Sequence, residues 1–486
     1  MKKQTNRYPS ECTTIIVGKE LMEDGSMIAA RSEDWDAMVA KNLEIFETTE
    51  NGPEEFIAKE TPFRCKLPKR RIGYSALSPY HLHGEWGSAG FNREGVGMSA
   101  TESIFSSEKV LQYDPLVEDG LAENSVFNIV LPYITTAREG VERLGSLIEK
   151  HGIAEGFGIS FIDEHEMWYL ETASGHRWLA TRIPEDKYFV SGNQSRFRDY
   201  DPKDKTNYLA SEDLIDFAKE HHLYEGDFDF HEAYARDEKL DTTYSYPRVW
   251  YLQQMYTPSK EQDVTKNDFP VFLKSDKKLT LCDIKKGFRS HYNDTEHDPY
   301  LHCNPKEPWR PISIFRTTQT HILQRRPGLP KEIGQIDYMC EGMAALGIFL
   351  PLYEGIKSYP EAYRIGGGES CNKSAYWKFR HVQILGMTDY NRYAPVIQET
   401  YAQLEEEIAQ RQREMEQEYL AIYKDRPLAA QDLLQRFSDD MLTRALEVTD
   451  ELTERLFTLI ALHIGETYEF HVARSIDHHT LIAGSL

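Results

Sequence analysis

Three residue types that support nucleophilic catalysis occur near the start of the chain. Cys12 opens one run of apolar and β-branched residues, and Arg31 and Asp34 lie at the end of a second such run. A short acidic turn containing glycine separates the two runs, which is the pattern of a β-hairpin. Because a hairpin returns the second strand beside the first, we predict that the thiol, the guanidinium and the carboxylate lie together.

The thiol of Cys12 could act as a nucleophile if a base were placed beside it. A free cysteine has a pKa of about 8.5 and attacks a carbonyl only as thiolate. If the Glu11–Cys12 bond is cut, Cys12 gains an α-amino group whose ordinary pKa is about 7.7–8.0. One terminal residue would then hold nucleophile and base together. We therefore interpret residues 1–11 as a propeptide and Glu11–Cys12 as the processing site; a buried structural cysteine is the alternative.

Five further sequence blocks follow Cys12 in order. They are Gly-Phe-Asn-Arg-Glu-Gly-Val-Gly-Met-Ser-Ala-Thr-Glu (90–102), Trp-Tyr-Leu-Glu (168–171), Ser-Gly-Asn-Gln (191–194), Pro-Arg-Val-Trp (247–250) and Arg-Thr-Thr-Gln-Thr-His (316–321). Together with Cys12 and the Arg-x-x-Asp at 31–34, these blocks resemble the cysteine N-terminal nucleophile (Ntn) hydrolases, and most closely the C69 dipeptidases.

The resemblance implies a fold and a reaction. The implied fold is α+β, the four-layer αββα sandwich of the Ntn hydrolases. The implied reaction begins with autocatalytic removal of residues 1–11, in which the Cys12 thiol attacks the Glu11 carbonyl. The matured thiol then forms an acyl-enzyme with its substrate, which water hydrolyses. This chemistry requires no cofactor.

The resemblance also implies roles for matched residues. Arg31 is expected to favour the thiolate, and Asp34 to hold the new α-amino group. Asn193 matches the oxyanion-hole asparagine, and Arg248 matches a distal arginine of the active site. An ion pair at a strand end and an ordinary turn asparagine are the alternatives for these residues. The neighbouring Glu33 is given no catalytic role.

Glu102 occupies a place where relatives that cleave acylated amides carry asparagine or tyrosine. A carboxylate beside the nucleophile would pair with the free α-ammonium of a peptide and would disfavour an N-acylated substrate. We therefore interpret Glu102 as substrate-binding, and the chain as a thiol protease that hydrolyses dipeptides with a free N-terminus. A solvated loop glutamate is the alternative.

The elements that must position these residues are sheets with helices outside them. Residues 12–390 are predicted as the catalytic domain, and residues 391–486 as a helical extension. The expected helices cover 125–136, 137–152, a run from Ile397 to Pro427, and Leu433–His463; the expected strands include 156–161, 166–172, 187–192, Ile312–Gln324 and Ala344–Tyr353. Residues 199–310 are predicted as surface helices and loops. The last two helices are expected to pack on their own domain, with a coiled-coil homo-oligomer left open.

Composition excludes several other functions. The formal charge of −23, from 56 basic and 79 acidic residues, would repel a phosphate backbone, so nucleic acid is not expected as a partner. Six scattered cysteines form no Cys-x-x-Cys pair, and His81-x-His83 lacks further ligands at familiar spacing, so no metal site is expected. No apolar run is long enough to cross a membrane, and residues 1–11 lack a secretory pattern. The prediction is a cytoplasmic protein.

Three other functions remain open. An Ntn amidase of N-acyl substrates, of the penicillin V or bile-salt type, would share the nucleophile; a dipeptide assayed beside its N-acetyl form separates the two. A papain-like Cys–His protease would be active without processing. A non-catalytic scaffold of the same fold would have no need to lose residues 1–11, so intact mass would distinguish it.

Overall fold

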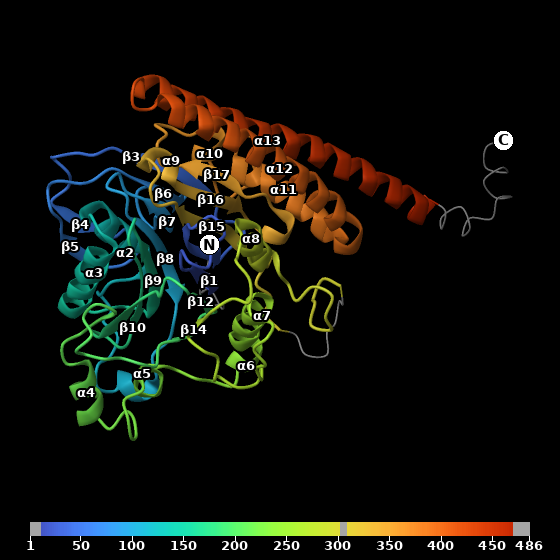
Figure 1. Cartoon of the computed structure of the whole chain (residues 1–486). Coiled ribbons are helices and arrows are strands. Elements are labelled where there is room, and N and C mark those ends of the chain that lie inside the picture. Colours follow the sequence, from blue (N-terminus) through green and yellow to red (C-terminus); the bar gives the residue numbers. More distant parts are fainter. Residues whose placement is uncertain (1–10, 302–308, 470–486) are drawn as a thin grey trace, which may run out of the picture.

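The hairpin that begins near Cys12 lies at the centre of a seven-stranded sheet. The computed structural model describes residues 11–301 and 309–469 (Figure 1). The predicted hairpin is confirmed, because β1 (Glu11–Val17) and β2 (Met27–Asp34) pair antiparallel. The spatial order is β14 (Phe272–Leu273), β12 (Tyr188–Ser191), β1, β2, β15 (Thr317–Arg325), β16 (Gln335–Glu341) and β17 (Leu350–Tyr353).

A six-stranded sheet packs against the first one. Its order is β13 (Tyr208–Ala210), β11 (Trp178–Arg182), β10 (Met167–Thr172), β9 (Phe157–Ile162), β8 (Gly97–Ser103) and β7 (Ala89–Phe91). β8 contacts both β1 and β2, so it lies across the hairpin. Every residue of β2, β8, β9 and β10 is buried, as expected for strands covered on both faces. Two small sheets pair β3 (Lys41–Phe46) with β6 (Tyr74–Pro79), and β4 (Glu55–Ile57) with β5 (Arg64–Lys66).

Helices cover the outer side of each sheet. On one side, α2 (Glu123–Val130) contacts β8, and α3 (Ala137–His151) contacts β9, β10 and β11. On the other side, α7 (Tyr246–Tyr256) contacts β12, and α11 (Ala375–Thr388) contacts β16. The predicted α+β fold, with two sheets between two helical layers, is therefore confirmed (Figure 1).

The remaining helices are short. They are α1 (Glu108–Leu111), η1 (Leu131–Tyr133), α4 (Leu214–Glu220), α5 (Phe230–Tyr234), α6 (Asp241–Tyr244), α8 (Leu281–Arg289), α9 (Lys331–Gly334), η2 (Ala344–Leu346), α10 (Glu361–Arg364) and η3 (Gly465–Glu469). Several of them lie in the segment 199–310, where surface helices and loops were predicted.

Two long helices form the C-terminal part of the described chain. α12 (Tyr390–Ile422) and α13 (Pro427–Ile464) pack against each other, and α13 also contacts β17. Pro427 was predicted to end the first helix; instead it begins the second, because proline fits the first helical turn, where its missing N–H has no intrahelical acceptor. At 1.5 Å per residue α13 spans about 57 Å, and its end projects beyond the body (Figure 1).

Some boundaries differ from the sequence-based prediction. Ala344–Tyr353 was predicted as one core strand, but it divides into η2 and β17. β11 and β16 were not predicted. The predicted start of the helical extension, after residue 390, lies at the beginning of α12. Glu11, the last residue of the predicted propeptide, is the first residue of β1. The other ten residues of the predicted propeptide lie outside the described residues.

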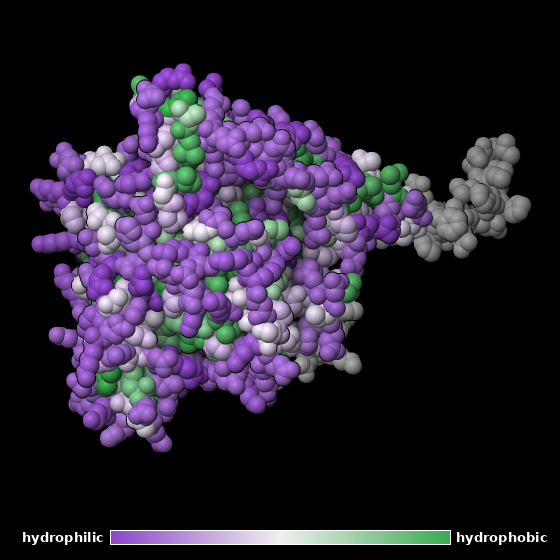
Figure 2. Space-filling model, viewed as in Figure 1, coloured by the Kyte–Doolittle hydropathy of each residue, from purple (hydrophilic) through white to green (hydrophobic). Residues whose placement is uncertain are grey.

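The visible surface is mainly hydrophilic (Figure 2). Apolar side chains gather at the end of α13, where Phe457, Leu462 and Ile464 are half exposed or more. Within the two described ranges, every helix is too short or too polar to cross a membrane.

Candidate active site

Strand pairing places Cys12 and Arg31 on one face of the central sheet. Cys12 lies opposite Glu33, and Thr14 lies opposite Arg31, so these four side chains point to the same side. Arg31 Nη1 lies 2.9 Å from Cys12 Sγ. Cys12 is fully buried and Arg31 is 2 % exposed. The predicted meeting of thiol and guanidinium is present in the structure.

The end of β8 holds this pair from the second sheet. Cys12 Sγ donates to the carbonyl oxygen of Thr101 at 3.4 Å. Arg31 Nη1 donates to the same oxygen at 2.7 Å, and Nη2 donates to the carbonyl of Ala100. Backbone carbonyls therefore orient the guanidinium, which fixes its charge beside the sulfur.

The backbone of Cys12 is held by Asn193 and Arg248. The Cys12 amide donates to Asn193 Oδ1 at 3.0 Å, and its carbonyl oxygen accepts from Arg248 Nη1 at 2.6 Å. Arg248 Nη2 also donates to Asn193 Oδ1, at 3.0 Å, and to the Gly192 carbonyl at 2.7 Å. Asn193 has a φ of 65°, a left-handed conformation that asparagine tolerates. Asn193 and Arg248 therefore do come together at Cys12.

Arg248 reaches the site from the first turn of α7 and is fully buried. A Cβ at Gly192 would approach the Arg248 guanidinium carbon at 3.1 Å, which is closer than nearly all real contacts. Gly192 in the Ser-Gly-Asn-Gln block therefore lets the arginine approach this turn. The nitrogen of the same side-chain amide, Asn193 Nδ2, donates one N–H to the Ser103 carbonyl at 3.0 Å.

Asp34 does not face the thiol. It lies opposite Glu11 in the strand register, and its side chain points to the other face of the sheet because neighbouring strand residues alternate. Its carboxylate accepts from Thr317 Oγ1 at 2.5 Å and from Ser32 Oγ at 3.2 Å, and it pairs with Arg310. Ser32 Oγ also accepts from the Thr13 amide at 3.2 Å, so Asp34 reaches the backbone beside Cys12 through Ser32.

Glu33, which was given no catalytic role, is the carboxylate on the thiol's face. It pairs with Lys41 Nζ at 2.6 Å, accepts from Gln319 Nε2 at 3.0 Å and lies 3.5 Å from Arg31 Nη2. Burial acts to raise its pKa, but Lys41 and then Arg31 outweigh burial and lower the pKa to about 2. Arg31, Lys41 and Glu33 thus carry a net charge of +1 around the thiol. Lys41 was missed because β3 brings it from outside the hairpin.

A buried histidine lies near this cluster but does not contact the thiol. His321 is opposite Arg31 in the register of β15 and β2, and its ring nitrogens contact Ser99 Oγ at 2.7 Å and Gln319 Oε1 at 3.1 Å. Burial, together with Arg31 and Lys41, holds the pKa of His321 well below its usual range. A neutral imidazole bonded to Ser99 and Gln319 does not form the Cys–His pair that a papain-like protease needs.

Glu102 differs from its expected place beside a substrate. Its side chain is fully buried, and Oε1 accepts from the Asn193 amide at 2.6 Å and from Ser191 Oγ at 2.7 Å. Tyr169 OH donates to Oε2 at 3.1 Å. The carboxylate therefore holds the turn that carries Asn193, whereas sequence reasoning assigned it to the substrate's α-ammonium.

The intact chain keeps the thiol protonated. Burial raises the pKa of Cys12 to about 12, while Arg31 acts in the opposite direction. The sulfur therefore needs a group that takes its proton before it can attack as thiolate.

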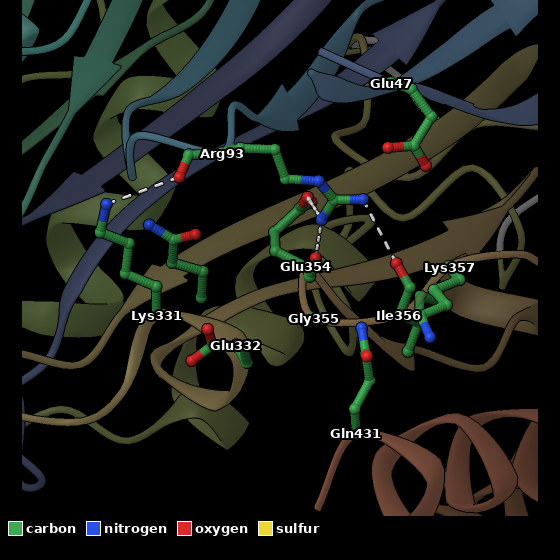
Figure 3. A pocket seen from close by; sticks show the side chains of 10 residues that line it. Glu47, Arg93, Lys331, Glu332, Glu354, Gly355, Ile356, Lys357 and Gln431 are labelled. Carbon is green, nitrogen blue, oxygen red and sulfur yellow. Dashed lines mark hydrogen bonds and ion pairs between the residues drawn. The ribbon is translucent and has the colours of Figure 1, made fainter. Parts of the chain in front are cut away.

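A separate polar cavity of about 360 Å³ lies away from Cys12 (Figure 3). Arg93 crosses it and donates to the carbonyl oxygens of Glu354 and Ile356, while Lys331 and Lys357 stand at its sides. None of the predicted site residues lines this cavity. No group of three or more His, Cys, Asp or Glu side chains in the described ranges is arranged to hold a metal ion.

Comparison with known proteins is consistent with the resemblance. The family model described as "Peptidase family C69" matches residues 11–403. A protein of Salmonella dublin named "Probable dipeptidase" is 47 % identical over 354 residues, covering 72 % of this chain and 82 % of that protein. "Dipeptidase A" of Lactobacillus helveticus is 34 % identical over 397 residues, covering 79 % and 83 %. A solved structure, a mutant of the conjugated bile acid hydrolase from Clostridium perfringens, is 11 % identical with a TM-score of 0.30 and covers 71 % of this chain and 93 % of that one.

Proposed function

Since the chain belongs to peptidase family C69, and is a peptidase, we propose that it hydrolyses dipeptides through an acyl-enzyme on Cys12 after residues 1–11 are removed. One observation carries this proposal. The sulfur of Cys12 lies beside a buried arginine, while the amide and carbonyl of the same residue are held by Asn193 and Arg248. These contacts support Cys12 as the nucleophile and its own nitrogen as the base.

Maturation would begin at the Glu11–Cys12 peptide bond. The sulfur attacks the Glu11 carbonyl carbon, the C–N bond breaks, and the thiol proton passes to the released nitrogen. The product is a thioester between Glu11 and Cys12 Sγ. Water hydrolyses it, which frees residues 1–11 with a carboxyl terminus and restores the thiol. Arg31 supports both steps, because its charge favours sulfur as thiolate when it attacks and when it leaves.

Turnover would use the same groups. The released amine donates one N–H to Asn193 Oδ1, where the Cys12 amide now donates, so its lone pair can accept the thiol proton. The thiolate attacks the peptide carbonyl, and the protonated amine passes its proton to the leaving amino acid. Asn193 Nδ2 donates one N–H to Ser103, and its second N–H can stabilise the developing oxyanion.

Glu102 and Asp34 would act as positioning residues. Glu102 fixes Asn193 through its amide, and Asp34 fixes Ser32 and so the Thr13 amide. Arg248 ties the Cys12 carbonyl to Asn193, so that the distance between the amine and its acceptor is preserved during the reaction.

Intact mass, N-terminal sequencing and a dipeptidase assay test this proposal. We expect the purified protein to begin at Cys12 and to hydrolyse dipeptides. Cys12→Ala should keep residues 1–11 and lose turnover. Cys340→Ala is the matched control, because Cys340 is also a fully buried thiol but lies in β16. An active species that still carries residues 1–11, or a Cys12→Ala protein with normal turnover, would refute the proposal.

A further inference from the structure

Glu123 is a second buried carboxylate at the edge of the candidate active site. It is the first residue of α2 and is 4 % exposed. Its Oε1 accepts from Ser103 Oγ at 2.7 Å, and the carbonyl of the same serine accepts from Asn193 Nδ2. Glu123 therefore borders the segment of β8 that holds Cys12, Arg31 and Asn193.

Thr101 connects the carboxylate with the thiol. The Thr101 carbonyl accepts from Cys12 Sγ, and the Thr101 hydroxyl lies close enough to Glu123 to lower its pKa. Thr101 is 1 % exposed, and its hydroxyl has no hydrogen bond of normal geometry to any residue that the structure describes. The side-chain oxygen of Asn124, the next residue of α2, is also buried and without a partner. Thr101 therefore lies between the thiol and the carboxylate.

Glu123 differs from the other carboxylates of the site because it has neither a cation partner nor three hydrogen-bond donors. Glu33 has Lys41, Asp34 has Arg310, and Glu102 accepts three hydrogen bonds. Glu123 forms no ion pair within residues 11–301 and 309–469. Burial, followed by the nearby Glu155, raises its pKa to about 8, although Ser103, Thr101 and Arg31 act to lower it. A cation that arrives beside this carboxyl favours its ionised form and lowers its pKa.

The geometry of a dipeptide brings such a cation to this place. Standard bond lengths put the α-nitrogen of the first residue about 2.5 Å from the carbonyl carbon that the nucleophile attacks. A group that recognises a free α-ammonium must therefore lie next to the sulfur. Glu123 lies near enough to the sulfur to raise the pKa of Cys12, with Thr101 between the two. The oxygens of Glu102 are instead used within the protein.

We propose that Glu123 is the carboxylate that binds the free α-ammonium group of the substrate. This inference rests on the proposed function, since it assigns a substrate contact at the same site. It makes Glu123 the specificity residue that separates peptides with a free N-terminus from N-acyl compounds.

The test compares two substrates that differ only at the α-nitrogen. L-Alanyl-L-alanine carries the ammonium, and propionyl-L-alanine replaces it by hydrogen. We expect Glu123→Gln, made in the full chain, to lose residues 1–11 as the unsubstituted protein does. Its kcat/KM for alanyl-alanine should fall about 10- to 100-fold, mainly through KM, because a charged partner is lost. Its kcat/KM for propionyl-alanine should stay within about twofold, so the preference for the free amine collapses.

Controls separate this inference from the general mechanism. Glu108→Gln also removes a glutamate from the first position of a helix, but Glu108 is exposed and should leave both substrates unaffected. A processed Glu123→Gln protein with an undiminished preference for alanyl-alanine would overturn the role of Glu123 and leave the proposed function standing. Dipeptide turnover that survives Cys12→Ala would instead overturn the proposed function.

A second variant covers failure of processing. If Glu123→Gln keeps residues 1–11, the same assay is made with Glu123→Asp. Aspartate keeps the carboxyl group, but its side chain is one methylene shorter, so the carboxyl lies farther from the substrate. We then expect a higher KM for alanyl-alanine and an unchanged KM for propionyl-alanine. Equal KM values for alanyl-alanine in Glu123→Asp and the unsubstituted protein would overturn the inference.

Discussion

Replacing Arg31 should raise the pKa of the Cys12 thiol in the matured protein. The guanidinium lies 2.9 Å from the sulfur, and both side chains are buried. At an effective dielectric constant of about 20, a unit charge at this distance favours the thiolate by about 6 kcal/mol. Glu33, 3.5 Å from the same guanidinium, cancels part of this effect. We therefore expect Arg31→Gln to raise the thiol pKa by about two units, within the range known for a neighbouring charge.

The rate of alkylation by iodoacetamide, measured against pH, reports this change. A thiol pKa raised by two units lowers the thiolate fraction about 100-fold at neutral pH, so alkylation and kcat/KM should both move to higher pH. Arg31→Lys keeps the charge but loses the fork that contacts the carbonyls of Ala100 and Thr101. It should therefore shift the pKa less than Arg31→Gln while still lowering kcat.

Two controls separate the effect on the thiol pKa from loss of maturation and from loss of a buried arginine in general. Because Arg31 is also expected to support maturation, each variant can be expressed with an initiator methionine directly before Cys12, whose removal yields the mature N-terminus. Arg325→Gln removes another buried arginine, one that pairs with Glu164, and should leave the thiol pKa unchanged. An alkylation profile of Arg31→Gln that coincides with that of the unsubstituted protein would refute the electrostatic argument.

Three other substitutions test the catalytic site, the packing of α13 and a buried carboxyl of β16. Arg248→Lys should lower kcat about 10- to 100-fold in steady-state assays, because one ammonium cannot bind the Cys12 carbonyl, Gly192 and Asn193 together; unchanged kcat would contradict its role. Leu434→Ala, at a fully buried position of α13, should reduce the free energy of unfolding by about 2–5 kcal/mol, whereas Leu428→Ala, 74 % exposed, should change it by less than about 0.5 kcal/mol in urea unfolding. Burial raises the pKa of Glu341 from 4.5 to about 8, while Arg380 acts to lower it. Neither oxygen of this carboxyl has a hydrogen bond to a described residue. The stability that the protonated carboxyl contributes is complete below pH 4.5 and is lost as the pH rises through 8. The urea midpoint of Glu341→Gln should therefore exceed that of the unsubstituted protein by more at pH 9 than at pH 6. An equal difference between the two midpoints at both pH values would contradict this.

Local sequence patterns predicted several elements of the fold. The hairpin follows from two short apolar runs around a glycine turn, and α3 follows from its helical period and Gly152, whose φ of 70° suits a residue without a Cβ. The periodic apolar positions also predicted both long C-terminal helices. β16 (Gln-Ile-Asp-Tyr-Met-Cys-Glu) was missed because buried polar residues interrupt its apolar run, although it follows β15 and precedes β17 in the chain and pairs with both.

The sequence by itself determined that Cys12 and Arg31 meet, because they share one hairpin and one face. Only the tertiary structure decided which carboxylate serves which group. Alternation along β2 turns Asp34 away from the thiol and Glu33 toward it. The stacking of β8 on the hairpin brings Glu102 under Asn193, and the packing of α2 against β8 brings Glu123 beside Thr101. Residue types near a motif indicate the available chemistry, but the face of a strand and the packing of a second sheet determine which side chains reach the reacting atoms.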